Sequence, residues 1–589
     1  MLIQGDGAET APLKNTVRKK NKIHEISTAN TNTMKQLLAL LLLTAANVAF
    51  AQKAPAAIKV TYQKSYLGKP QDEANPVIIF SDKEKTLVTS QQLLDKKAAL
   101  PAEQVLVQHP ATYTQFAELK PGSFVAMRDT IALKKQTFEL LPDTKTILGY
   151  TCHKAKIVIN SNTVELWYTN DLGLKGAPSV LGQELGLVLE TNRNNNFLVT
   201  ATKIEKLKRL PATVTLPANA KVTDNLSYRD LIWKARFTTI PVFTEQQINF
   251  SDASKSNDSV LRFANGTIAL RKIKFPDIKA GSQVFAQLTE QSAGDAYDRA
   301  GSVFVIPQDQ KQSFLDGLTN GANTLPVYEN GNGEKYVGMV RTGGFTPLLE
   351  LMRFFTPFGI SQYNTIQLKG KTWHNAVPYR QDISELIPYL SGKELYVGVF
   401  IGNYDKGGHK VSLELTVHAD ELAYNKATKA IPLFDTVNVM EMAGQGYSTM
   451  FNNEKGLEVT FTLDKPLKYA RLRYITTGHG GWENGDEFIP KKNTISLDGK
   501  EAFSFIPWRQ DCGSYRLFNP ASGNFENGLS SSDYSRSNWC PGTVTNPNFI
   551  PLGNLPAGTH TIRVQIPQGA PEGGSFSAWN VSGVLLGEE

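Results

Sequence analysis

Val411-Ser412-Leu413-Glu414-Leu415-Thr416-Val417 alternates apolar and polar side chains without interruption. Successive side chains of an extended strand point to opposite faces, so this period of two gathers the apolar side chains on one face. The same alternation recurs in residues 470–474 and 562–566. Each segment therefore predicts a strand with one face in a hydrophobic core and the other in water.

Clusters of glycine and asparagine separate the strand patterns, as in Asn330-Gly331-Asn332-Gly333 and Lys406-Gly407-Gly408. These residue types adopt the backbone conformations of tight turns, and helical patterns in the chain are few. Short strands joined by such turns predict a mostly β protein built from antiparallel sandwiches.

The chain has 589 residues, which is more than one hydrophobic core organises. Shifts in composition divide it into a β-rich N-terminal domain at 52–215, a polar linker at 216–237, and two further β blocks at 238–425 and 426–589. We expect the N-terminal domain to be an accessory to the two blocks that follow.

The N-terminus carries the pattern of a secretory signal peptide at 34–51. Met34-Lys35-Gln36 precedes an apolar run at 37–46, and Ala49-Phe50-Ala51 supplies small residues for cleavage. Residues 1–33 are then an extension upstream of the natural start. The alternative interpretation of the apolar run at 37–46 is a buried helix. We expect an exported monomer, periplasmic or extracellular, with no membrane span because the apolar run is too short.

The charge balance argues against a polyanionic partner. The whole chain has a net charge of +7, and loss of the six basic and three acidic residues up to position 51 lowers it to +4. No basic block follows the signal peptide, so nucleic acid is not an expected partner.

Three cysteines are too few for a disulfide-rich scaffold. In an exported protein Cys512 and Cys540 are expected to pair, closing a loop that is poor in apolar residues. That crosslink is worth roughly 3–4 kcal/mol in the chain-entropy model and would hold Arg536 and Trp539 in place. The alternative is a plain staple around a surface loop. Cys152 is expected to be a buried thiol.

Two polar segments could carry chemistry. The first, at 477–488, follows a strand pattern and contains Glu483, Asp486 and Glu487, which are candidates for acid/base work. The alternatives are a solvated acidic loop, or a metal site through His479, Asp486 and Glu487 that no known metal motif supports. The second segment contains Asp298 beside Arg299, a pairing that is more often a surface ion pair than a site.

Four motifs occur in an order that resembles the bacterial peptide:N-glycosidase F family, whose members are secreted amidases that remove N-linked glycans from asparagine. They are Tyr297-Asp298-Arg299, Gly478-His479-Gly480, Asp486-Glu487-Phe488 and Arg536-Ser537-Asn538-Trp539-Cys540-Pro541-Gly542. The resemblance covers residues 238–585. It implies two adjacent eight-stranded antiparallel jelly rolls, with the active site in the cleft between them.

The resemblance also implies roles for individual residues. Asp298 matches the family's essential acid and Glu487 a second carboxylate across the cleft, while the Cys512–Cys540 pair matches a family disulfide. The substrate would be an N-glycosylated protein or glycopeptide, and no metal or other cofactor is implied. The residues implied in substrate binding are Tyr297, Arg299, Gly478, His479, Arg536 and Trp539.

The sequence departs from the family pattern in two respects. Cysteines that flank the two carboxylate segments in the family are replaced here, by Gly294, Gly485 and Ile489. A third acidic residue of the family falls near Phe400. In the N-terminal domain, residues 173–178 and 186–190 weakly resemble the GLPGLI domain of exported Bacteroidetes proteins.

Two other classes of function remain open from the sequence. A non-catalytic glycan-binding protein can use the same sandwich fold, because fold does not determine function. An endo-acting glycoside hydrolase would also use two carboxylates but would cut between sugars.

Overall fold

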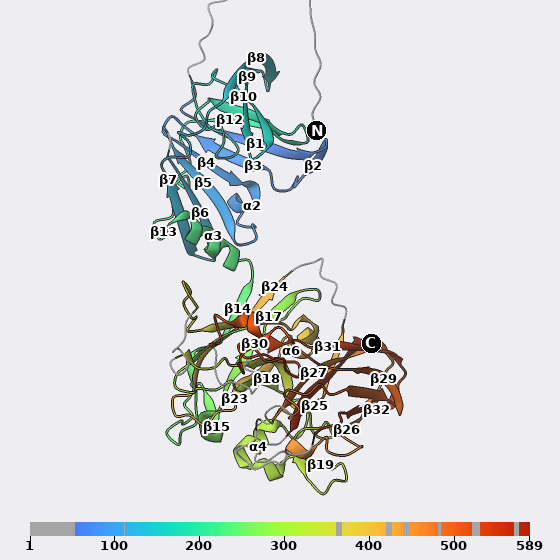
Figure 1. The fold of residues 1–589 in the computed structure, drawn as a ribbon. Helices are drawn as coiled ribbons and strands as arrows, with labels where there is room; N and C mark the ends of the chain where they lie inside the picture. The colour runs from blue at the N-terminus through green and yellow to red at the C-terminus, as the bar shows by residue number, and fades with distance from the viewer. Residues whose placement is uncertain are drawn as a thin grey trace, which may run out of the picture. The chain divides into compact units, whose positions relative to one another are not determined.

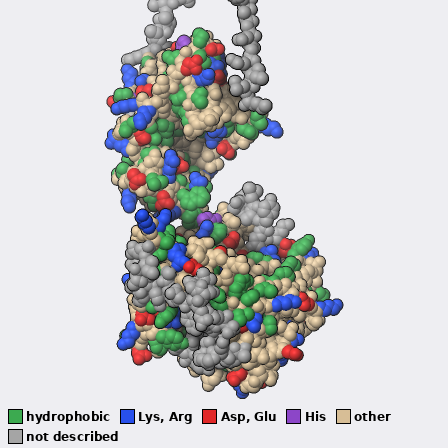
Figure 2. Space-filling model, viewed as in Figure 1, with side chains coloured by type: hydrophobic (Ala, Val, Ile, Leu, Met, Phe, Trp, Pro, Cys, Tyr) green, Lys and Arg blue, Asp and Glu red, His purple; other side chains and the backbone are tan. Residues whose placement is uncertain are grey.

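The computed structural model describes residues 54–589, except 111, 361–367, 420–426, 438, 440–446, 481–484, 521–529 and 570–576. The predicted extension and signal peptide, together with Glu483, therefore lie outside the described residues. The chain forms two units, the first up to Tyr228 and the second from Arg229 (Figure 1). Figure 2 shows basic and acidic side chains interspersed over the visible face, in keeping with the small net charge.

The first unit is built on one long sheet. Its strand order is β13-β7-β6-β5-β4-β3-β1-β12-β11-β10-β9-β8, with β2 also paired to β1. The neighbours are antiparallel except β13 and β7, which run parallel. The strands are β1 (Ala57–Tyr66), β2 (Lys69–Gln71), β3 (Val77–Ser81), β4 (Lys85–Ser90), β5 (Ala102–Gln108), β6 (Thr112–Lys120), β7 (Ser123–Asp129), β8 (Glu139–Ile147), β9 (Tyr150–Ile159), β10 (Asn162–Thr169), β11 (Leu187–Arg193), β12 (Phe197–Leu207) and β13 (Lys221–Thr223).

The stretch expected as a linker, 216–237, contains regular structure. Its residues 221–223 form β13 on the free edge of β7, and helix α3 (Asn225–Lys234) follows. The polar composition of residues 217–225 hid β13, because an edge strand needs few apolar residues. Helix α3 itself contains apolar side chains, of which Tyr228 and Ile232 are buried. A second short helix, α2 (Gln91–Leu94), follows β4, and Cys152 is fully buried as a free thiol.

The second unit begins with two facing sheets. One has the order β14-β24-β17-β22, and the other has the order β15-β16-β23-β18-β21-β30. The side chains Val411, Leu413 and Leu415 are at most 1% exposed in the core between them, so the predicted period-two strand is confirmed. The elements are β14 (Thr238–Ile248), β15 (Leu261–Phe263), β16 (Ile268–Lys274), β17 (Gln283–Ser292), β18 (Ala300–Ile306), α4 (Phe314–Asn320), β19 (Val327–Tyr328), β20 (Tyr336–Val337), β21 (Leu349–Phe355), β22 (Val377–Asp382), α6 (Ile387–Leu390), β23 (Glu394–Ile401) and β24 (His409–His418).

Two more four-stranded sheets complete the second unit. Their orders are β25-β33-β27-β31 and β26-β32-β28-β29, and their facing apolar side chains make a separate core. The predicted mostly β, antiparallel architecture is thus confirmed. The strands are β25 (Lys429–Asp435), β26 (Leu457–Leu463), β27 (Leu467–His479), β28 (Asn493–Leu497), β29 (Lys500–Phe505), β30 (Thr543–Thr545), β31 (Asn548–Leu555), β32 (Gly558–Gln565) and β33 (Ala578–Glu588).

The two blocks of the second unit are joined by more than the chain. Strand β30 comes from the last block but pairs with β21 of the first, at Arg353–Thr545 through Phe355–Thr543. The buried Arg353 pairs with Glu350 at 2.8 Å and also donates to the carbonyl of Asn580 at 2.6 Å, so it ties β21 to β33. This network fixes the relative position of loops that belong to different blocks.

We expect Arg353→Met to lower the free energy of unfolding by about 3–5 kcal/mol, because it leaves the buried Glu350 carboxylate without its cation. Lys272→Met is the matched control, since it breaks an exposed pair with Glu394 and should cost at most about 1 kcal/mol. Urea denaturation of both variants measures the difference. Equal losses would contradict the tying role of Arg353.

None of the helices in the described part of the chain has the length and apolar character needed to cross a bilayer.

Candidate active site

Three side chains from distant parts of the sequence meet in the second unit. Asp298 lies between β17 and β18, Glu487 follows β27, and Arg536 precedes β30. Nη1 of Arg536 donates to Oδ2 of Asp298 at 3.0 Å and also to Oε1 of Glu487. The Arg536 side chain is 1% exposed, whereas the Asp298 and Glu487 side chains are 16% and 18% exposed. A ligand can therefore reach both carboxyl groups over a buried guanidinium.

The surroundings of Arg536 hold it in one position. Its Nη2 donates to the hydroxyl of Ser531 at 2.9 Å, and its backbone exchanges two hydrogen bonds with Arg509. Its guanidinium carbon lies 4.3 Å from the centroid of the Trp539 ring. The predicted disulfide between Cys512 and Cys540 is present and closes the loop that contains Arg536 and Trp539.

Burial sets the protonation of the two carboxyl groups. Removal from water raises the pKa of Asp298, and the positive charge of Arg536 only partly offsets this effect. Burial also raises the pKa of Glu487 to about 7. The positive charge of Arg536 opposes this rise, and the negative charge of Asp298 adds to it. The two groups titrate as a pair, so one shared cation favours a state with one ionised and one protonated carboxyl near neutral pH.

Trp539 is buried beside this pair, with 3% of its surface exposed. Its indole Nε1 donates to the carbonyl of Gly478 at 2.9 Å, and its ring stacks on Phe355 at 4.2 Å between centroids. A side chain at Gly478 would have its Cβ 2.8 Å from the ring of Trp579, so glycine is required there. Close packing of this kind keeps the Trp539 ring in a fixed plane.

His479 is neutral in this packing. Burial, together with the charges of Arg353 and Arg536, lowers its pKa to about 3. Its Nε2 shares a hydrogen bond of 2.8 Å with the Thr477 hydroxyl, and its ring lies 5.5 Å from that of Trp539. His479 therefore packs against Trp539 as an uncharged ring at neutral pH.

Arg299 contacts a different carboxylate from the one expected. Its Nε and Nη2 donate to Asp295 at 2.7 and 3.1 Å, in place of the neighbouring Asp298. The guanidinium carbon also lies 5.1 Å from the ring of Tyr297, which is 53% exposed. Asp298 therefore pairs with Arg536, and Arg299 stabilises the loop that positions Asp298 through its contact with Asp295.

Sequence reasoning missed the buried ionic chain beneath that loop. Nε2 of His409 lies 3.4 Å from Asp295, and Nδ1 lies 2.8 Å from Glu290. Burial alone would favour neutral His409, but hydrogen bonds to the two carboxylates raise its pKa to about 9. The available signals were the spacing of four between Asp295 and Arg299 and a histidine directly after the turn at 406–408.

Asp486 has a structural role in place of the acid/base role considered above. Its carboxylate accepts hydrogen bonds from the indole of Trp579 at 2.7 Å and from the backbone of Gly569, and it is fully buried. Within the described residues, no group of three or more His, Cys, Asp and Glu side chains is arranged to hold a metal ion. Phe400, near which the third acidic residue of the family was expected, is buried in β23.

Comparison with known families and structures gives consistent matches along the chain. Residues 60–230 match an N-terminal domain of N-glycanases. Residues 239–417 and 446–586 match the N-terminal and C-terminal domains of peptide-N-glycosidase F. A search of curated protein sequences gave no match.

Two crystal forms of PNGF-II are similar to the chain over most of its length. Both are 57% identical with a TM-score of 0.83, and the alignments cover 90% and 91% of this chain and 98% and 99% of theirs. PNGase F from Flavobacterium meningosepticum, described as a glycosylasparaginase, is 15% identical with a TM-score of 0.40, covering 60% of this chain and 96% of its own.

Proposed function

Because the chain belongs to the peptide-N-glycosidase F family, we propose that it hydrolyses the β-aspartylglucosylamine bond of N-glycoproteins and glycopeptides. The products are an aspartate in the peptide and a glycosylamine, which then loses ammonia in water. The single observation that carries this proposal is the pair Asp298 and Glu487, held on one guanidinium of Arg536.

The unequal protonation of the pair suits the two proton transfers of amide hydrolysis. Ionised Asp298 takes a proton from water as the water oxygen bonds to the side-chain amide carbon. The carbon–nitrogen bond then breaks, and Glu487 donates its proton to the leaving nitrogen. A pKa of about 7 for Glu487 is well placed for this step, since an acid works best with a pKa near the operating pH.

Arg536 adds electrostatic stabilisation to these transfers. Negative charge develops on the amide oxygen during attack, and a fixed cation in a partly dry site stabilises that charge without reorganising. The exposed ring of Tyr297 offers a flat face beside the site for sugar or peptide groups, while the buried Trp539 supports the guanidinium of Arg536. Export is part of the proposal and is supported by the signal pattern and the disulfide.

A glycopeptide with one glycosylated asparagine tests the function. We expect its peptide product to carry aspartate, heavier than the asparagine form by about one mass unit, whereas a glycosidase would leave a sugar on the asparagine. Mass spectrometry of the peptide after incubation with the protein measures this. A retained N-acetylglucosamine or an unchanged glycopeptide would contradict the amidase and favour, respectively, the glycosidase or the glycan-binding protein.

A further inference from the structure

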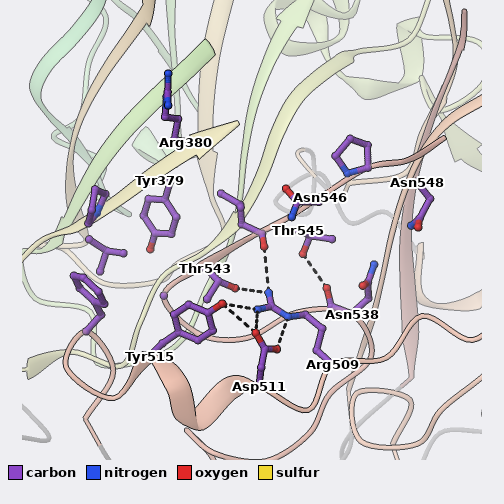
Figure 3. A pocket seen from close by; sticks show the side chains of 16 residues that line it. Tyr379, Arg380, Arg509, Asp511, Tyr515, Asn538, Thr543, Thr545, Asn546 and Asn548 are labelled. Carbon is purple, nitrogen blue, oxygen red and sulfur yellow. Dashed lines mark hydrogen bonds and ion pairs between the residues drawn. The ribbon is translucent and has the colours of Figure 1, made fainter. Parts of the chain in front are cut away.

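We propose that a second cavity in the second unit, separate from the carboxylate pair, binds a neutral sugar unit of an oligosaccharide. The cavity has a volume of about 670 Å³ and lies between β22 on one side and residues 538–548 on the other (Figure 3). That volume lies within the range of about 300–1,000 Å³ that small-molecule sites occupy. No role assigned above uses this cavity.

The floor of the cavity is a rigid polar network around Arg509. All five of its N–H groups are used, two on Asp511, two on Thr543 and the carbonyl of Val544, and one on the hydroxyl of Tyr515. Figure 3 shows these side chains converging at the floor. Because Arg509 is fully satisfied and paired with a carboxylate, it does not present an open cationic site to an anion.

The rest of the lining supplies what a polyhydroxylated ligand needs. Asp511 is 48% exposed and has acceptor capacity left beyond its bonds to Arg509 and Tyr515. The side-chain amides of Asn546 and Asn548 make no hydrogen bond with any described residue, so their donors and acceptors are open. A sugar hydroxyl both donates and accepts, and it can therefore bridge an amide and a carboxylate.

Aromatic rings line the same cavity. Tyr515 and Phe518 line it with partly buried rings, whereas Tyr379 on the β22 side is 3% exposed and presents little of its ring. Flat rings of this kind cover the apolar face of a sugar ring, while the polar groups at the edge fix its orientation. This combination favours a neutral sugar over a phosphate, because Arg509 is fully paired. The other lining arginine, Arg380, points away from the Arg509 network in Figure 3, and its guanidinium carbon lies 3.8 Å from the centroid of the Phe285 ring.

The cavity is anchored to the catalytic arginine. The backbones of Arg509 and Arg536 exchange hydrogen bonds of 2.8 and 3.0 Å. The Cys512–Cys540 disulfide joins the segment that follows Asp511 to the side of the cavity formed by residues 538–548. A sugar held in the cavity is thus positioned by the segment that positions Arg536. We infer that the ligand is an outer sugar of the glycan being removed; this last step alone rests on the proposed function.

The test measures sugar binding without turnover. Ligand-observed NMR titration with N-acetyllactosamine should show binding by the wild-type protein and by Asp298→Asn. Binding should weaken by about tenfold or more in Asn546→Ala/Asn548→Ala, which loses two hydrogen-bonding amides. Asn323→Ala, at an exposed asparagine outside the cavity, is the matched control and should bind as the wild type does.

The exposed single variant Asn546→Ala guards against misfolding of the double variant and should give an intermediate loss. A second probe, sialylated N-acetyllactosamine, adds a carboxylate to the same sugar. Absence of binding by the wild type, equal binding by the double variant and the control, or binding that requires the carboxylate would each overturn the proposal. Because no glycopeptide is cleaved in this assay, it can fail while the amidase activity stands, and the reverse also holds.

Discussion

Asp298→Asn is expected to reduce deglycosylation by about 10²–10⁴-fold, the contribution of a positioned general base. The substitution keeps the size of the side chain and an acceptor for Nη1 of Arg536, so it removes the base and little else. Single-turnover kinetics with a glycopeptide measure the loss. Asp252→Asn, at an exposed aspartate in the same unit, is the matched control and should be fully active.

The same variant should not lose stability. Folding raises the pKa of Asp298, so ionisation of this carboxyl costs stability as the pH rises through its ordinary range. Neutral asparagine removes that cost, and the Tm at neutral pH should be equal to or above that of the wild type. A variant that is inactive because it is unfolded, or one that is folded and active, would contradict the role given to Asp298.

Local patterns were sufficient to predict the strands in which apolar and polar side chains alternate. The alternation at 411–417 predicted β24 because its cause, the opposite orientation of successive side chains, acts within the strand. Residues 221–223 showed no such pattern, because β13 exists only through its pairing with β7. An element that depends on a partner from elsewhere in the chain leaves little trace in its own composition.

The same distinction between local patterns and long-range contacts applies to the site. The motifs pointed to Asp298, Glu487 and Arg536 one by one, and the structure brings the three side chains together. The partner of Arg299 could not be read from adjacency, since Asp295, four residues earlier, is the carboxylate buried beside it. The contacts of His409 join β24 to β17 and to the loop after it, and no local pattern records such contacts.

Arg536→Met is expected to lower kcat by about 10²–10³-fold, the usual cost of removing one preorganised group that stabilises developing charge. It should also move the pH profile. Arg536 lowers the pKa of both Asp298 and Glu487, so its loss raises both values. Asp298 must be ionised and Glu487 protonated, and therefore both limbs of the profile should shift to higher pH.

Arg536→Lys separates charge from geometry. Lysine restores a positive charge beside the carboxyl pair but not the planar group that reaches Ser531 while it bonds both acids. We therefore expect the pH limbs to return towards their wild-type positions while kcat stays low. Arg563→Met, at a partly exposed arginine on β32, is the control and should change neither quantity. A profile of reduced height but unchanged position in Arg536→Met would show that Arg536 only supports the fold, because a structural defect lowers the rate at every pH without moving the two pKa values.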